Sequence, residues 1–411
     1  MMKSTMYMSA ALLTLTLGAG LPLAQAQTPT EAKTETVRAE VGKPLQEAAE
    51  LVKAKQFSEA LAKIQSTEAV TDRTAFENFT IDRMRGAAAA GAGQLDLAVE
   101  SFQRVIDSGR LPPAEQLQLV EGVAGSYFKS QNYPKAIVWA QRYLKDGGSN
   151  DNIKNVLLQS QYLTGDYAAV ATTLKAQIAA DDQAGRATSE IQLQLLADSA
   201  LKMRDMPGYT AALEQLVQKY PKPNYWTSLI AQVSRQPGFS DRYMIDVLRL
   251  QRATGTLTTA ADYMLMAELT MQAALPAEAL AVLEEGFAAS KIGTGAQAAR
   301  AEKLRSQART QAAADQKVLP DIEGSAQKAA SGIALVNVGT NYLGQKQYPK
   351  AAALIEQGIA KGGLKHPEEA KLHLGIALQL AGDKARAATA FKAVQGRDGA
   401  ADLARIWSYQ K

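Results

Sequence analysis

Small and bulky residues recur along most of the chain in a fixed order. Eight segments of the chain can be aligned on this order. In most of them a Gly or Ala is followed twelve positions later by another Gly or Ala, and a bulky, often aromatic residue stands three positions before that second small residue. Two antiparallel helices approach closely only where their side chains are small, so this pattern predicts helical hairpins. The eight aligned segments are Ala48/Phe57/Ala60, Gly86/Leu95/Ala98, Ala124/Tyr133/Ala136, Leu158/Tyr167/Val170, Ala200/Tyr209/Ala212, Ala267/Pro276/Ala279, Gly339/Tyr348/Ala351 and Gly375/Lys384/Ala387.

The breaks along the chain also fit hairpins. Turn-forming pairs such as Gly165-Asp166, Pro207-Gly208 and Gly382-Asp383 fall between the two small positions, where a hairpin must reverse. If each of the two long gaps hides one degenerate hairpin, the mean repeat is about 36 residues. We expect drifted hairpins at 226–252 and 297–330. No stretch shows the alternation of a strand, so the predicted fold is all-α.

The best-preserved segments resemble the tetratricopeptide repeat (TPR) family. Residues 338–342 (Val-Gly-Thr-Asn-Tyr) match the first helix of such a repeat, and residues 348–351 (Tyr-Pro-Lys-Ala) match the start of its second helix. The resemblance implies a right-handed α-solenoid of about ten TPR-like helical hairpins over residues 43–411. It also implies a scaffold for proteins and peptides rather than an enzyme, with ligands in a groove lined by the first helix of each pair.

Short segments in the C-terminal third resemble a narrower group, the periplasmic TPR proteins that accompany TonB/ExbB/ExbD energy-transduction systems in Gram-negative bacteria. The segments are 262–263, 283–286, 361–364 and 373–377, with Trp407 near the end. This resemblance implies an accessory scaffold that helps couple the proton-motive force to uptake across the outer membrane. Its implied partners are TonB-, ExbB- or ExbD-type components.

The N-terminus carries the pattern of a secretory signal peptide. A lysine precedes an apolar stretch at 10–23, and residues 24–26 (Ala-Gln-Ala) are small where signal peptidase requires it. We predict that residues 1–26 are a signal peptide cleaved after Ala26, that 27–42 form a flexible leader, and that the product is periplasmic. An uncleaved anchor is the alternative, but the apolar stretch is shorter than the ~20 residues that span a bilayer.

Composition narrows the possible chemistry. The chain has no Cys and two His, which excludes disulfides, thiolate nucleophiles and Cys-ligated zinc and leaves little material for a His-based metal site. The formal charge of +4 is small and dispersed, without the basic run that nucleic-acid binders carry. We therefore expect no cofactor, no bound metal and no nucleic-acid partner.

Three motifs suggest catalysis or ligand binding, and each has a structural alternative that we prefer. Ser199 and Lys202 have the Ser-x-x-Lys spacing of an acyl-transfer nucleophile, but the companion motifs are missing. Residues 293–298 match a Gly-x-Gly-x-x-Ala loop, but they follow a helix pattern rather than a strand, so we expect a turn before the next helix. Glu369 and His373 are one helical turn apart, and we expect a surface His–Glu contact rather than a metal site.

The first helix of each hairpin should line the groove. Positions on the groove side of this helix can be counted from its small residue. They give ten candidate partner-contact residues, which are Arg83, Glu121, Lys129, Asn155, Gln159, Tyr162, Met264, Glu268, Met271 and Asn337. The alternative is solvated surface for most of them, and core packing for Met264 and Met271. Asn337 matches one position of the clamp with which some TPR proteins hold a peptide carboxylate. The next repeat has Glu369 and His373 where that clamp needs Lys and Arg, so the clamp is incomplete.

Together these observations predict an exported, non-catalytic scaffold that binds protein partners of the cell envelope, as an accessory of a TonB/ExbB/ExbD system. Two alternatives stay open. One is a scaffold for envelope assembly or secretion. The other is an envelope hydrolase, for which Ser199 and Lys202 are the visible material.

Overall fold

The structure is a computed structural model that describes residues 35–411. The predicted signal peptide and most of the predicted leader lie outside the described residues. The chain divides into two compact units, Met1–Tyr127 and Phe128–Lys411. All regular structure among the described residues is helical, with twenty α-helices and three short 3₁₀ helices. The prediction of an all-α fold is therefore confirmed.

The first unit contains two helical hairpins followed by a single helix. Its helices are α1 Ala39–Lys53, α2 Phe57–Gln65, α3 Ala75–Gly91, α4 Leu95–Asp107 and α5 Pro113–Lys129, whose last two residues belong to the second unit. Helix α1 packs against α2, α2 packs against α3, and α3 packs against α4. A 3₁₀ helix, Ser66–Ala69, leads out of α2.

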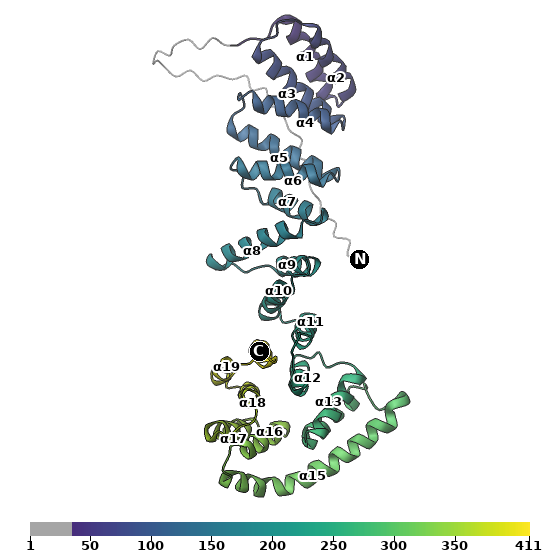
Figure 1. The fold of residues 1–411 in the computed structure, drawn as a ribbon. Coiled ribbons are helices and arrows are strands. Elements are labelled where there is room, and N and C mark those ends of the chain that lie inside the picture. Colours follow the sequence, from purple (N-terminus) through teal and green to yellow (C-terminus); the bar gives the residue numbers. More distant parts are fainter. Residues whose placement is uncertain (1–34) are drawn as a thin grey trace, which may run out of the picture. The chain divides into compact units, whose positions relative to one another are not determined.

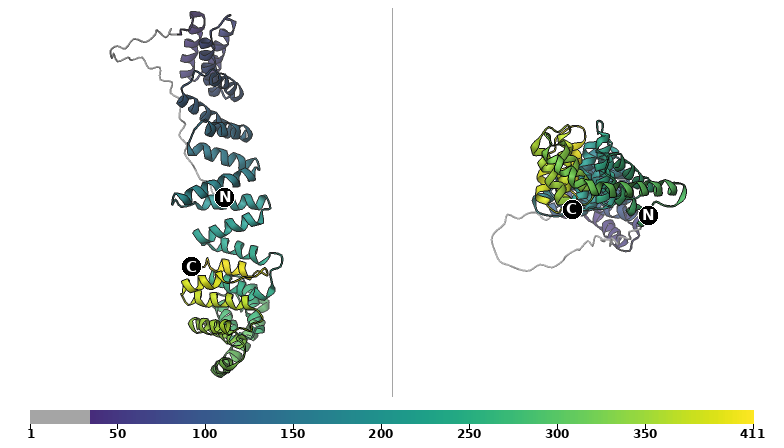
Figure 2. Two further views of the ribbon diagram at one scale, coloured as in Figure 1. Left: turned by 60° about the vertical axis from the view of Figure 1, so that its left-hand side comes forward. Right: turned by 90° about the horizontal axis from the view of Figure 1, so that it is seen from below.

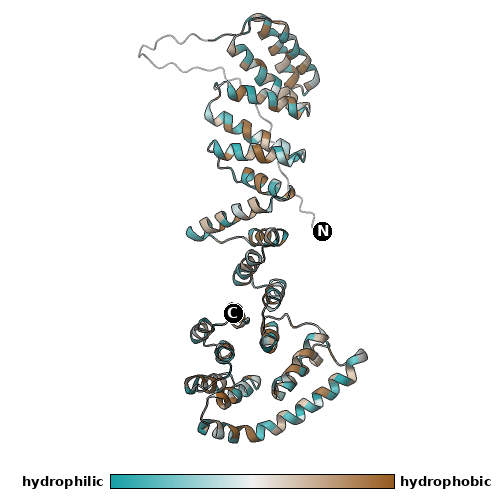
Figure 3. Cartoon of the chain, viewed as in Figure 1, coloured by the Kyte–Doolittle hydropathy of each residue, from teal (hydrophilic) through white to brown (hydrophobic). Residues whose placement is uncertain are grey.

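The second unit is itself a succession of packed helices (Figure 1). Its helices are α6 Tyr133–Lys145, α7 Asp151–Leu163, α8 Tyr167–Gln183, α9 Glu190–Lys202, α10 Met206–Lys219, α11 Pro223–Ser234, α12 Met244–Ala253, α13 Ala260–Gln272, α14 Pro276–Ala288, α15 Ala298–Lys328, α16 Ile333–Gly344, α17 Tyr348–Lys361, α18 Pro367–Leu380, α19 Lys384–Lys392 and α20 Ala400–Trp407. The 3₁₀ helices Asp241–Tyr243 and Gly295–Gln297 precede α12 and α15. Each helix packs against the next one along the chain, and polar and apolar residues alternate around the helices (Figure 3).

Glycines mark points at which the two helices of a hairpin cross. A Cβ atom at Gly86 of α3 would lie 2.3 Å from Cε1 of Phe102 on α4, and one at Gly375 of α18 would lie 2.4 Å from the ring of Phe391 on α19. Each Phe follows the second small residue of its segment by four positions. The large side chain of the second helix thus fills the space that a side chain would need on the first.

The C-terminal helix returns to the middle of the second unit (Figure 1, Figure 2). Helix α20 packs against α11 as well as against α18 and α19. Arg405 Nη2 lies 3.0 Å from Glu214 Oε1 of α10, and the Tyr409 hydroxyl donates a hydrogen bond of 3.0 Å to the other oxygen of Glu214. The Tyr243 hydroxyl donates a hydrogen bond of 2.9 Å to Asp398. Through the α11–α20 packing and the Tyr243–Asp398 bond, residues 223–411 close on themselves, and Glu214 ties their C-terminal end to α10. We call residues 223–411, from α11 to α20, the closed module.

One of the two regions with a weak repeat pattern departs from the prediction. The expected hairpin at 297–330 is wrong, because a single helix of 31 residues, α15, covers this region. Residues 298–319 contain no Gly or Pro and are rich in good helix formers, so nothing in them ends a helix. Pro320 lacks one backbone donor but does not end α15 either. The other weak region, 226–252, is the expected drifted hairpin, formed by α11 and α12.

The predicted leader extends too far. Helix α1 begins at Ala39, and the side chain of Val41 is fully buried, so the last residues of the predicted leader belong to the folded first unit. Arg38, just before α1, donates from Nε to Glu77 Oε1 at 2.8 Å and from Nη2 to Glu77 Oε2 at 2.9 Å. Glu77 also completes a capping box with Thr74 at the start of α3. A polar anchor therefore orders a segment that composition alone marks as flexible.

The Glu77 anchor makes the first unit sensitive to acid. The hydrogen bonds from the Arg38 side chain and the Thr74 backbone hold the pKa of Glu77 at about 2, against an ordinary value of 4.5. Because the folded-state pKa is lowered, the stabilisation is complete above the ordinary pKa and is lost as the pH falls toward 2. The wild type should melt at a higher temperature than Glu77→Gln at pH 7, and this gap should shrink below pH 4.5.

Far-UV circular dichroism melts of the full chain between pH 7 and pH 2.5 would measure this gap. Glu47→Gln is the matched control, because Glu47 pairs with Lys63 at 2.6 Å while its side chain is 57% exposed. Its melting temperature should stay close to that of the wild type at every pH. A Glu77→Gln gap that does not change with pH would contradict the assignment.

Candidate functional site

The ten candidate groove residues are spread over both units and do not gather at one site. Five have exposed side chains, and these are Arg83, Lys129, Asn155, Gln159 and Asn337. Four are half-buried, and these are Glu121, Tyr162, Glu268 and Met271. Met264 is buried. Contact of any of them with a partner stays a prediction.

Several of these polar candidates are already engaged within the chain. Arg83 Nη2 lies 3.0 Å from a carboxylate oxygen of Glu115, and Glu268 lies 2.7 Å from Arg300. The Tyr162 hydroxyl donates a hydrogen bond of 2.5 Å to Asp198, and this bond together with burial raises the pKa of Tyr162 to about 12. A partner would have to compete with these contacts.

The two candidate methionines belong to the core. Met264 is 4% exposed and packs in one cluster with Ala267, Ala279 and Leu283, and Met271 packs against the same cluster. Met264 is therefore wrong as a groove residue. The seven-residue spacing places both side chains on the face of α13 that packs against α14. The alternative interpretation of these two residues, packing in the core, therefore describes them better.

Helix α7 gives the clearest free polar face among the candidates. Asn155 and Gln159 are one turn apart and both exposed, whereas Ile153, Leu157 and Leu158 on the same helix are buried. Side chains four residues apart lie on one side of a helix. Helix α7 therefore presents a short amide strip to solvent while its apolar side packs within the unit.

A cluster of ionisable side chains lies inside the closed module. Asp246 and Arg249 of α12, Glu278 of α14 and His373 of α18 are each 7% exposed or less. Arg249 Nη1 lies 2.8 Å from Asp246 Oδ1, and Arg249 Nη2 lies 2.6 Å from Glu278 Oε2. His373 Nε2 lies 3.2 Å from Asp246 Oδ2. We call these four residues the buried charge cluster.

Two further helices reach this cluster. The Trp407 indole of α20 donates a hydrogen bond of 3.2 Å to the backbone oxygen of Asp246. The Thr340 hydroxyl of α16 lies 3.3 Å from His373 Nδ1. The cluster therefore joins α12, α14, α16, α18 and α20, which are far apart in sequence.

Burial and charge act in opposite directions within the cluster. Burial by itself raises the pKa of Asp246, but His373 and Arg249 outweigh it, so the pKa lies below its ordinary value. Burial lowers the pKa of Arg249, and Glu278 and Asp246 raise it by more. Asp246 and Arg249 are thus each kept charged by their neighbours.

The predicted position of His373 at the surface is wrong. The expected surface contact with Glu369 is not formed, because His373 is buried against Asp246 and Glu369 lies 3.8 Å from Arg242. A signal for the cluster exists in the sequence. Asp246 and Arg249 have helical i, i+3 spacing within an otherwise apolar stretch, which marks a buried pair rather than a solvated one.

The motifs with possible catalytic meaning are not assembled for catalysis. Ser199 is fully buried and its hydroxyl has no hydrogen-bond partner, whereas Lys202 is exposed. Residues 293–298 form the expected turn between α14 and α15. Among residues 35–411, no three His, Cys, Asp or Glu side chains are grouped as a metal ion would need. No helix in the same residues has both the length and the hydropathy to cross a membrane.

The pairing of the helices identifies the fold. Hairpins such as α3/α4 and α18/α19 cross at glycines in the positions of the repeat. The fold is an α-solenoid of TPR-like hairpins. Long α15 interrupts the repeat, and α20 ends it.

Comparisons with known proteins give similar solved structures. No family model matches the sequence, and no curated protein matches it. Among solved structures, the chain is similar to the TPR2AB domain of yeast Sti1 in a complex with pHSP90, with 17% identity over 66% of this chain and 98% of that one and a TM-score of 0.33. It is also similar to a tetratricopeptide repeat protein from Parabacteroides merdae, with 11% identity over 82% and 99% and a TM-score of 0.29. These TM-scores are low, so the fold is identified from the helix pairs of this chain itself.

The buried charge cluster should contribute strongly to stability. Arg249→Met leaves Asp246 and Glu278 buried without their cation, and breaking a buried pair in this way costs about 3–5 kcal/mol. Arg252→Met, one turn further along α12, removes a pair with the partly exposed Glu285 and should cost about 1 kcal/mol or less. Urea unfolding followed by tryptophan fluorescence would measure both, since Trp407 touches the cluster. Equal losses for the two variants would contradict the role of the cluster.

Proposed function

We propose that this chain is a non-catalytic scaffold that binds protein partners through the exposed faces of its hairpins. The observation that carries the proposal is the amide strip of Asn155 and Gln159 on α7, which is exposed on a helix whose other face is packed. Side-chain amides donate and accept hydrogen bonds, so they suit the recognition of another polypeptide. The separation of buried Ser199 from exposed Lys202 favours this proposal over an envelope hydrolase.

We further propose that the scaffold is exported to the periplasm and acts as an accessory of a TonB/ExbB/ExbD system. The support comes from the sequence, through the signal-peptide pattern at 1–26 and the resemblance of the C-terminal third to TPR proteins that accompany these systems. A scaffold for envelope assembly or secretion is the second candidate, and it has the same signal-peptide support.

Export can be tested by the form of the protein that accumulates in a Gram-negative host. The full chain should appear in the periplasmic fraction with Gln27 as its first residue, because the small residues at 24 and 26 fit signal peptidase. Intact mass spectrometry of the fractions would show this. Ala26→Arg should block cleavage, whereas Gln25→Ala, at the position between the small ones, should be processed normally. Recovery of the uncleaved wild-type chain from the cytoplasm would contradict the proposal.

The partner proposal can be tested by affinity purification of residues 27–411 from a crosslinked envelope fraction. We expect TonB-, ExbB- or ExbD-type proteins to be enriched, as identified by mass spectrometry. The double variant Asn155→Glu/Gln159→Glu should recover at least about tenfold less partner, because it places two unpaired charges in the contact. A loss of about 1.4 kcal/mol in binding free energy is enough for a factor of ten. Lys175→Glu is the matched control, because Lys175 is exposed on the second helix of the same pair, α8.

The outcomes separate the two levels of the proposal. Enrichment of assembly or secretion proteins instead would keep the scaffold and reject the energy-transduction role. Equal recovery with the double variant and the control would reject the α7 strip as the binding face. Absence of any protein enriched above a mock purification would reject the scaffold.

A further inference from the structure

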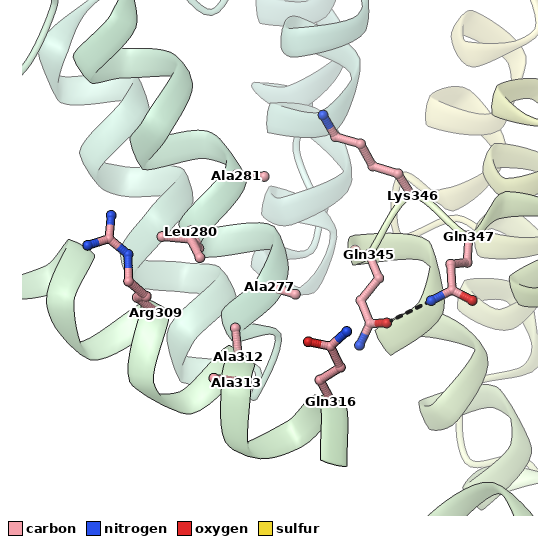
Figure 4. Close-up of a pocket in the computed structure, with 11 residues that line it drawn as sticks. Ala277, Leu280, Ala281, Arg309, Ala312, Ala313, Gln316, Gln345, Lys346 and Gln347 are labelled. Atoms are coloured by element: carbon pink, nitrogen blue, oxygen red, sulfur yellow. Dashed lines mark hydrogen bonds between the residues drawn. The ribbon is translucent and has the colours of Figure 1, made fainter. Parts of the chain in front are cut away.

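A pocket of about 440 Å³ lies inside the closed module, between α14, the middle of α15 and the turn from α16 to α17 (Figure 4). Its apolar lining comes from Ala277, Leu280 and Ala281 on α14 and from Ala312 and Ala313 on α15. This volume falls in the range of pockets that hold ligands or peptide side chains.

The pocket exists because α15 spans a gap between two packed regions. The first part of α15 packs on α14 through Ala301 and Ala308, and its last part buries Leu319 and Ala326. None of the residues between them, 309–318, is buried. Nearly three turns of α15 therefore lie outside the buried core, and the alanines there leave room that bulkier residues would fill.

The lining of the pocket is positively charged. It includes Arg309 and Lys346 but no acidic residue. Their side chains are 61% and 54% exposed, so their charged ends stay accessible. Each cation shares its carboxylate with a second cation.

The ion pairs at the rim leave both cations able to attract a further anion. Glu284 is 2.6 Å from Arg309 and 3.7 Å from Arg305, which pairs more closely with Glu302 at 2.7 Å. Glu285 is 3.5 Å from Lys346 and also pairs with Arg252. Since Arg252 and Lys346 share one carboxylate, and the end of Arg309 stays exposed beside its single partner, further carboxylates from a ligand would be attracted there.

Three amides form the wall of the pocket opposite the alanines. The Gln347 amide donates a hydrogen bond of 3.0 Å to Gln345 Oε1, and the side chain of Gln316 extends toward Gln345 (Figure 4). A side-chain amide offers both a donor and an acceptor, as a backbone peptide group does. An extended peptide has free N–H and C=O groups for such a wall, whereas a helix uses its own internally.

We propose that this pocket binds an extended acidic segment of a partner protein. One apolar side chain of the segment sits between the alanines of α14 and α15, its carboxylates lie beside Arg309 and Lys346, and its backbone bonds to the glutamines. The proposal rests on the scaffold function and adds to it a second contact site, separate from the α7 strip, with a defined ligand chemistry.

Fluorescence polarisation with the full chain, at about 0.1 M salt, tests the proposal. The probe is a fluorescein-labelled peptide, Ser-Glu-Val-Glu-Leu-Glu-Val-Ser, and its partner probe carries Lys in place of each Glu. The acidic peptide should bind at least about tenfold more tightly than the basic one, and added salt should weaken it. Ala313→Trp, which fills the pocket from an exposed position, and Arg309→Glu/Lys346→Glu should each weaken binding at least about tenfold. Lys303→Glu is the control, because Lys303 is exposed on the same helix and outside the pocket.

Each contrary result has a distinct meaning. Equal binding of the two peptides, or unchanged binding to Ala313→Trp, would overturn the proposal. Displacement of the peptide by free glutamate at equal concentration would identify a small anion as the occupant. Transferred NOEs with strong amide–amide rather than Hα–amide contacts would identify a helix. The Ala313→Trp variant can also be used in the affinity purification from the envelope fraction. If it recovers the same partners as the wild type, the scaffold function is retained and the pocket does not contribute to it.

Discussion

The charge of Arg249, held inside the closed module, is the constraint on which the rest of that module depends. A buried guanidinium without carboxylates would cost several kcal/mol, so Asp246 and Glu278 must stand beside it and α12 must lie against α14. The second oxygen of Asp246 then needs a partner, which His373 supplies from α18. Trp407 of α20, itself fully buried, donates a hydrogen bond to the Asp246 backbone, and burial of the whole cluster strengthens each of these interactions. Apolar side chains could fill such a space with the helices packed in many relative positions. The ion pairs of Arg249 form in only one of these positions.

Closure of the module fixes both ends of α15 on different neighbours. Its first part packs on α14, and Glu323 near its end accepts a hydrogen bond of 2.7 Å from Tyr342 of α16. Helices α14 and α16 are in turn in contact at Glu278 of α14 and Gly344 of α16. The two residues are so close that a Cβ atom added to Gly344 would lie 2.9 Å from the Cβ of Glu278. The unpacked middle of α15 therefore results from the positions of its neighbours rather than from weak packing of α15 alone.

The sequence predicts the parts of this structure that depend on local spacing. Gly375 and Phe391 could be paired from their positions because each hairpin repeats the same crossing within about 36 residues. Helix α15 could not be foreseen from the repeat, because helix propensity continues past the point where a hairpin would turn. His373 was misplaced for a different reason. Periodicity relates it to Glu369 on its own helix, whereas its true partner, Asp246, is 127 positions away. Among the candidate contact residues, Asn155 and Gln159 are exposed as predicted. Met264 is not, because its spacing also fits the face that meets α14.

The same closure bears on how the pocket beside α15 would bind. A flexible groove must be ordered when a ligand enters, and that cost reduces the affinity gained from contact. Here the apolar lining belongs to two helices that are held apart by packing at both ends of α15, and the cations at the rim are oriented by Glu284 and Glu285 before any ligand arrives. The ordering cost therefore falls on the ligand rather than on the protein. A short acidic segment could then gain useful affinity from few contacts, and the buried charge cluster, although it touches no ligand, supports that affinity by fixing the neighbours of α15.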